Sequence, residues 1–306
     1  MASMKQIKQR KRSVDSTGKI TKAMKLVATV KLQKTKQIAT DAIPYFDAMY
    51  ETLSDMIRKS NGIKHKYLSG KEGAKKAVIV FSSNKGLAGS YNSNIVRKLF
   101  GENSSYDFNK DNTLVYSIGS KLRDEFKRRG FTIARDYSEN MEDVHYENIT
   151  NMTNEILDDF VAGKINEIYL VYTFFKNTIV HIPRVLKLIP LTSIDNSDDE
   201  ETELLGKKTF EVAKSEYASD DKMPMNYELE DDEMLNYTIP LYISSLLFGA
   251  LAASLASENG ARMTAMDSAT KNAKELSEKL NVAYNRARQG AITQEITEIV
   301  AGANAI

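Results

Sequence analysis

The stretch MTAMDSATKNAKELSEKLNVAYNRARQGAITQEITEIVAGANAI, residues 263–306, contains no proline, and its apolar residues recur at helical spacing. From residue 266 onward, small and apolar residues follow each other about every 3.5 residues, the pattern of a coiled-coil seam. The seam positions are Met266, Ala269, Ala273, Leu276, Leu280, Ala283, Ala287 and Gly290. Because many of them are only alanine, the sequence predicts a helix that approaches a second helix closely and forms a slender pair.

The N-terminal segment offers the partner helix. Ile20, Met24, Val27 and Val30 lie three to four residues apart, and the spacing continues to residue 56. Pro44 is expected to bend the helix, and Asn61-Gly62 to end it. We therefore predict an antiparallel two-helix coiled coil built from residues 1–60 and 237–306. Such a pair buries little apolar area and would be marginally stable alone, so a surrounding structure would explain it.

Between these segments, residues 75–192 alternate strand and helix patterns. Apolar runs at 77–83, 113–119, 131–137 and 167–175 are typical of strands. Amphipathic stretches with helical spacing separate these four runs from one another. A turn at Lys176-Asn177 is expected to lead into a further paired strand. Alternating strands and helices imply a mainly parallel sheet. The predicted fold class is thus α/β, with a Rossmann-like domain inserted into the coiled coil.

Charge is distributed unevenly along the chain. Residues 1–36 carry eleven Lys/Arg and one acid, whereas residues 195–233 carry fifteen Asp/Glu and four lysines. We expect the acidic segment, residues 193–236, to be a surface loop excursion. The apolar run at 239–256 is marginal for a membrane span, which needs about 20 residues, and is expected to be a helix buried against protein. No cysteine is present, which fits a reducing compartment and excludes thiol chemistry.

Few residues indicate catalysis. The three histidines are scattered, and no spaced metal site or nucleophile elbow appears. The turn NKGLAGS, residues 84–90, follows a strand and precedes a helix, so a phosphate could bind there, although Gly86 and Gly89 more simply provide a tight turn. The basic N-terminal arm could contact nucleic-acid phosphates, but it has little aromatic interleaving. We expect no cofactor, no metal and no catalytic residue.

Four motifs resemble the F-type ATP synthase gamma subunit of bacterial type, from end to end and in order. KITKAMKLVATVKL (19–32) is similar to the family's N-terminal helix signature, and SNKGLAGSYNSNI (83–95) to the first turn of its middle domain. SENGARMTAMDSATKNA (257–273) resembles the entry of the C-terminal helix, and RARQGAITQEITEIVAGANA (286–305) the C-terminal signature.

The resemblance implies a function. The family's two terminal helices form the central rotor shaft inside a ring of three alpha and three beta subunits, and its globular part contacts the c-ring and the epsilon subunit. Rotation driven by H⁺ or Na⁺ flow couples to ATP synthesis, reversibly, while the chain itself catalyses nothing. The implied location is the cytoplasmic face of the cell membrane, as a peripheral part of the complex, without membrane insertion or nucleic acid.

The resemblance also implies site residues. Arg288 and Gln289 would bond to a beta-subunit loop as a catch, and Thr293 and Glu295 would take part in coupling. Met24 would face Arg262 near the beta subunits. In the foot that meets the c-ring and epsilon, the implied contacts are Tyr227 and Glu228.

Two positions depart from the family pattern and put helix regularity in question, Gly18 and Lys11. A nucleic-acid-binding coiled coil that uses the basic arm remains the alternative. A nucleotide-binding enzyme that uses Lys85 and Gly86 is a third hypothesis.

Overall fold

The computed structural model describes residues 4–59, 65–68, 74–102, 106–141, 145–190 and 231–303. Two long helices carry the ends of the chain, α1 (Met4–Lys59) and α6 (Asp231–Ala303). Both helices were predicted, and α1 ends two residues before the expected Asn-Gly stop. Pro44 lies inside α1 and Pro240 inside α6, and each helix continues past its proline.

The chain divides into two compact units. The first, which we call the helix-pair unit, comprises Met1–Val30 and Arg262–Ile306, and the second, the sheet unit, comprises Lys31–Ala261. The helices α1 and α6 each contribute one part to either unit. The predicted domain limits 1–60, 75–192, 193–236 and 237–306 remain a prediction. Residues 193–230, most of the predicted acidic excursion, lie outside the described residues, and its last six residues, 231–236, belong to α6.

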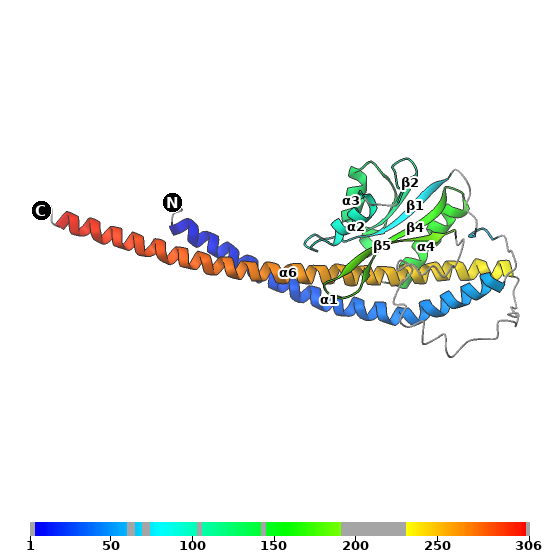
Figure 1. Ribbon diagram of the computed structural model, residues 1–306, viewed down its shortest axis with the longest axis horizontal. Helices are drawn as coiled ribbons and strands as arrows, with labels where there is room; N and C mark the ends of the chain where they lie inside the picture. The colour runs from blue at the N-terminus through cyan, green and yellow to red at the C-terminus, as the bar shows by residue number, and fades with distance from the viewer. Residues whose placement is uncertain are drawn as a thin grey trace. The chain divides into compact units, whose positions relative to one another are not determined.

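The sheet unit is built on five strands in the order β3-β2-β1-β4-β5 (Figure 1). The strands are β1 (Lys75–Phe81), β2 (Thr113–Ile118), β3 (Thr132–Asp136), β4 (Ile165–Phe175) and β5 (His181–Ile189). The first four pair in parallel, and β4 and β5 form the antiparallel hairpin that the sequence predicted. Between the strands lie α2 (Tyr91–Phe100), α3 (Ser120–Arg128), η1 (Ser138–Met141) and α4 (Tyr146–Val161).

Both faces of the sheet are buried, and β1 shows this most clearly. Its alternate residues Ala77, Ile79 and Phe81 enter one apolar cluster, while Val78 and Val80 enter another. The first cluster packs against α4 and the sheet-unit part of α6, and the second against α2 and α3. A sheet covered on both faces explains why β1 reads as a nearly continuous apolar run.

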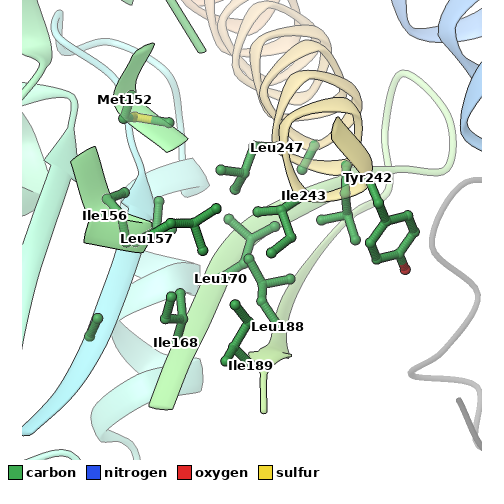
Figure 2. Close-up of a cluster of buried hydrophobic side chains, with 14 of the residues drawn as sticks. Met152, Ile156, Leu157, Ile168, Leu170, Leu188, Ile189, Tyr242, Ile243 and Leu247 are labelled. Carbon is green, nitrogen blue, oxygen red and sulfur yellow. The ribbon is translucent and has the colours of Figure 1, made fainter. Parts of the chain in front are cut away.

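The segment of α6 that borders the sheet contains the apolar run 239–256, whose length is marginal for a membrane span. In Figure 2 its side chain Ile243 lies beside Leu170 of β4 and Leu188 of β5, and Tyr242 and Leu247 belong to the same buried cluster. By length and composition, α6 is the one helix among the described residues that could cross a membrane, but 78% of its most apolar window is buried inside the protein. The burial confirms the prediction of a helix packed against protein.

The connection from β2 to α3 tests how closely the sheet unit is packed. Gly119 has a φ of 116°, and a Cβ added to it would lie 2.1 Å from the carbonyl oxygen of Ser82. Gly119→Ala is therefore expected to destabilise the protein by about 3 kcal/mol or more, since backbone strain adds to a clash with backbone. Urea denaturation followed by circular dichroism measures the loss.

Gly130→Ala is the matched control. Gly130 also has a positive φ, 81°, but no atom lies within 4 Å of its added Cβ. This variant is expected to lose only the strain of the left-handed conformation, about 1–2 kcal/mol. Equal losses in the two variants would contradict the packing argument.

Candidate functional site

Polar contacts hold the two helices of the helix-pair unit together. As residue numbers rise along α1, those of the partners on α6 fall, which confirms the predicted antiparallel pairing. The contacts join Lys11 Nζ to Asn281 Oδ1 (2.8 Å), Ser277 Oγ to Asp15 Oδ1, Thr21 Oγ1 to Thr270 Oγ1 (2.8 Å) and Lys25 Nζ to Asp267 Oδ1 (2.6 Å). Lys11 and Lys25 of the basic arm therefore engage α6.

The backbones of α1 and α6 come close together beside Gly18. A Cβ added to Gly18 would lie 3.4 Å from the Cβ of Ala273, which is ordinary van der Waals contact. Neither Gly18 nor Lys11 interrupts α1, which is continuous at both positions. The small residues expected at the seam thus meet a glycine across it.

The predicted seam on α6 is only partly confirmed. Met266 is buried, and Ala269, Ala273, Leu280 and Ala287 are half-buried. Leu276, Ala283 and Gly290 are exposed instead. The constant 3.5-residue spacing therefore assigned these three residues to the seam incorrectly. In the structure, the polar residues Thr270, Ser277 and Asn281 make the contacts with α1 instead.

Large apolar side chains of the helix-pair unit lie exposed. Those between 48% and 69% exposed are Ile20, Leu26, Val27, Val30, Val282, Ile292, Ile296, Ile299 and Val300. The periodicity of residues 20, 27 and 30 therefore correctly predicted a helix, but these side chains are not buried. An exposed apolar set of this extent is typical of a surface that another protein covers.

Sequence reasoning missed Leu26, Val282 and Val300 as members of this exposed set. The structure shows why: Thr21 bonds to Thr270 and Lys25 to Asp267 across the pair, a register that periodicity alone does not reveal. If polar residues fill the contact between two helices, the apolar residues near them must point elsewhere.

The predicted catch and coupling residues lie on one exposed stretch of α6. Arg288, Gln289 and Glu295 are exposed, and the Thr293 hydroxyl donates to the Gln289 carbonyl at 2.9 Å, within the helix. The side chains of Arg288 and Glu295 are thus placed for a partner to reach, and their roles remain predictions.

The structure gives less support to the other predicted contact residues. Met24 and Arg262 are both half-buried. Because Lys25 bonds Asp267, the residues opposite Met24 lie near Asp267, and Arg262 is about one and a half helical turns away from them. Their facing each other stays a prediction. Tyr227 and Glu228 lie outside the described residues.

The turn after β1, where a phosphate could have bound, is tight. Gly89 has a φ of 55° and Leu87 a φ of 62°, the left-handed conformation expected of such a turn. At its start, Asn92 Oδ1 accepts from the Ser83 amide and Asn92 Nδ2 donates to Ser83 Oγ. Asn84 accepts from the Ser120 amide and donates to the Ser138 carbonyl.

The neighbouring polar groups at this edge of the sheet are bonded in the same way. Ser82 Oγ donates to the Gly119 carbonyl, and Asp136 accepts from Ser138 and Arg123. Burial alone would raise the pKa of Asp136, but these hydrogen bonds outweigh it and hold that pKa below its usual value. The chain's own side chains thus occupy the edge where parallel sheets usually bind ligands.

Metal binding finds no support in the described part of the chain, where no group of three or more histidine or acidic side chains is arranged to hold an ion. Taken together, the geometry defines a class of protein. Its members have a Rossmann-like sheet unit, continued by two helices into an antiparallel pair with a polar seam and exposed apolar side chains.

Comparisons with known proteins identify the family. The ATP synthase family model matches residues 3–306. The ATP synthase gamma chain of Lachnoclostridium phytofermentans is 52% identical, with 100% of both chains covered. The sodium-ion-specific gamma chain of Acetobacterium woodii is 41% identical, covering 98% of this chain and 97% of that protein. The chain belongs to the ATP synthase gamma chain family, and the nucleic-acid alternative is not supported.

Solved structures share the fold. The Euglena gracilis mitochondrial ATP synthase, in a structure of OSCP, F1 and c-ring, contains a chain that matches with a TM-score of 0.58 and 18% identity, over 98% of this chain and 94% of that one. A chain of the central stalk and c-ring structure from Tetrahymena thermophila matches with a TM-score of 0.53 and 22% identity, over 82% and 99%.

The ion pairs at Asp267 give the helix-pair unit a pH dependence. Lys25 and Lys271 donate hydrogen bonds to the Asp267 carboxylate and lower its pKa. A carboxyl group of this kind stabilises the fold at pH values above its unfolded pKa, about 3.9, and the contribution is lost as the pH falls through the lower folded-state pKa. Asp267→Asn is expected to weaken the helix pair at neutral pH, by an amount that shrinks below about pH 4.

Urea denaturation of the full chain at a series of pH values measures this effect. Glu278→Gln, which neutralises an exposed carboxylate on the same helix, is the control and is expected to leave the midpoint nearly unchanged. A loss at Asp267 that stays constant into the acid range would contradict the ion-pair explanation.

Proposed function

We propose that this chain is the central rotor shaft of an F-type ATP synthase. The helix pair would turn inside a ring of three alpha and three beta subunits, and the sheet unit would sit toward the c-ring and the epsilon subunit. The chain would catalyse nothing itself. Ion-driven rotation would change the conformation of each beta subunit in turn and so drive ATP synthesis, with ATP hydrolysis as the reverse.

One observation carries the proposal: nine large apolar side chains of the helix-pair unit are exposed, while only a few apolar residues, such as Ala28 and Met266, are buried and polar groups bond across the pair. An ordinary coiled coil buries its apolar residues between its helices. A pair that leaves this many large apolar side chains outside its seam is suited to being surrounded by protein. Family membership supplies the identity of that surrounding protein.

Coupling requires that each orientation of the shaft favours a different conformation of the beta subunit facing it. A ligand or partner shifts such an equilibrium only by its differential affinity for the conformations. The helix pair is asymmetric, since apolar residues 20–30 belong to α1 and the cluster at 292–300 belongs to α6. Three surrounding beta subunits would therefore meet three different surfaces at any moment.

The proposed location follows from the assembly. The chain would be peripheral, on the cytoplasmic face of the cell membrane, held there by its contacts with the c-ring. Burial of the apolar segment of α6 inside the protein supports attachment through partners rather than insertion.

Co-purification tests the function directly. The chain, tagged at its N-terminus, is isolated from native membranes, and its partners and ATPase activity are measured. Three alpha and three beta copies per chain, with activity, are expected. A chain that emerges alone, or with nucleic acid, while the untagged chain behaves in the same way on fractionation, would contradict the proposal.

The catch makes a sharper prediction. Arg288→Ala combined with Gln289→Ala removes an exposed guanidinium and an amide that would bond to a beta-subunit loop. Hydrogen bonds to charged groups contribute about 1.5–3 kcal/mol, so ion-driven ATP synthesis is expected to fall about tenfold. Measurement uses membrane vesicles with equal amounts of assembled complex.

Lys274→Ala combined with Glu275→Ala is the matched control, because it removes two exposed polar side chains of the same helix outside the predicted set. Synthesis by this control should stay close to that of the unsubstituted chain. If the Arg288 and Gln289 substitutions leave synthesis unchanged as well, the catch role is wrong while the shaft proposal stands on assembly.

A further inference from the structure

Strand β4 is longer than its neighbour β1. Its pairing with β1 ends at Val171, while its pairing with β5 continues to Phe175. Beyond Val171, the β1 side of β4 therefore presents backbone groups that no strand satisfies. Buried backbone groups without partners are costly, so another element must supply the hydrogen bonds.

Helix α6 supplies them. The Thr173 amide donates to Ser254 Oγ at 3.1 Å, and Ser257 Oγ donates to the Thr173 carbonyl at 3.2 Å. Ser254 and Ser257 are fully buried. Two serines one turn apart thus take the place of a neighbouring strand and bind both backbone groups of one residue.

One turn further along α6, the helix touches the hairpin again. A Cβ added to Gly260 would lie 2.8 Å from His181 Nε2 and 3.3 Å from a ring carbon of Phe175. A side chain at residue 260 would therefore require the His181 ring to shift. His181 Nε2 is buried and has no hydrogen-bond partner among the described residues, and burial lowers the His181 pKa, which favours the neutral ring.

These residues form what we call the α6–β4 junction: Ser254, Ser257 and Gly260 on the helix, and Thr173, Phe175 and His181 on the hairpin. The junction occupies the last two turns of α6 in the sheet unit, which ends at Ala261. Most earlier contacts of α6 in this unit, such as those of Leu247 and Leu251, are apolar, and the hydrogen bond between Asn236 and His65 lies near the start of the helix. Apolar contacts are non-directional, whereas hydrogen bonds fix an orientation.

We propose that the α6–β4 junction is the torsional anchor of α6, and that Ser254 and Ser257 are positioning residues that prevent the helix from turning about its own axis. This inference rests on the proposed rotor function. Torque applied to the sheet unit would pass into α6 at the junction, and twist would accumulate only beyond it.

The length of the twisting segment gives the expected effect. From Ala261 to Arg288, α6 spans roughly 27 residues, or about 40 Å. Loss of the junction would free about 10 Å more, starting at Ser254. Since torsional stiffness of a uniform rod falls as its length rises, stiffness is expected to fall by about a fifth.

The test uses Ser254→Ala combined with Ser257→Ala in the assembled ATP synthase complex. A bead is attached through Lys110→Cys, an exposed position in a chain without native cysteine. With the alpha–beta ring fixed and the rotor stalled, the angular fluctuation of the bead reports torsional stiffness. Hydrogen exchange at the Thr173 amide reports the junction itself and should accelerate about tenfold on loss of its acceptor.

Ser244→Ala combined with Ser245→Ala is the matched control. Both serines are buried on the same helix, and among the described residues the Ser245 hydroxyl bonds within α6, to the Tyr242 carbonyl at 2.7 Å. This control should leave both the stiffness and the exchange at Thr173 unchanged. Faster exchange at Thr173 with lower stiffness, in the test variant only, supports the proposal.

Unchanged stiffness despite faster exchange would overturn it, as would an equal fall of stiffness in the control. Should the double variant not assemble, His181→Ala loosens the same junction from the hairpin side, with Ile179→Ala at the exposed tip as its control. Stiffness equal in these two would again overturn the anchor. A failure of the proposed rotor function gives a different result, because the bead would then not turn even in the unsubstituted complex. That result would overturn the torsional-anchor proposal as well.

Discussion

The close approach of two helices at a glycine is the constraint on which the helix-pair unit depends. Beside Gly18, an added Cβ would lie 3.4 Å from the Cβ of Ala273, in ordinary van der Waals contact, which leaves little room for a longer side chain directed at Ala273. Hydroxyl, carboxylate and ammonium groups make several of the other contacts, beside buried apolar residues such as Ala28 and Met266. Many bulky apolar side chains, such as Val27 and Val30, face away from the seam, and their exposure in the isolated chain is typical of a surface that a partner covers.

The sheet unit differs from the helix-pair unit because its apolar side chains are buried within the unit itself. Both faces of β1 are buried, and the polar groups at the carboxyl edge of the sheet bond to one another, as Ser83 does to Asn92 and Asn84 to Ser120. Many proteins of this fold class bind nucleotides at the carboxyl edge of the sheet. In this chain, side chains of the sheet unit bond to one another at that edge. This makes the unit a rigid support for α6, and it argues against the nucleotide-binding hypothesis built on Lys85 and Gly86.

Much of this could be predicted from the sequence, because helix and strand periodicities are local properties. The four parallel strands, the β4–β5 hairpin and the antiparallel pairing of the chain's ends were all predicted. The outward direction of Val27 and Val30 was not, because periodicity shows that residues share a face without showing what that face meets. The register that sets Thr21 against Thr270 also escaped, since it depends on contacts between segments almost 250 residues apart.

A rotor shaft needs firm attachment at one end and freedom to turn at the other, and α6 meets both needs by a change of residue type along one continuous helix. Before Ala261, its turns are buried and carry leucine, isoleucine and serine directed at the sheet. After Lys271, its turns are mostly exposed and rich in charged residues and alanine. Directional bonds to Thr173 stand at the end of the buried part. Beyond them, few deep contacts hold the helix, so a surrounding ring could slide past it and still sense which face it presents.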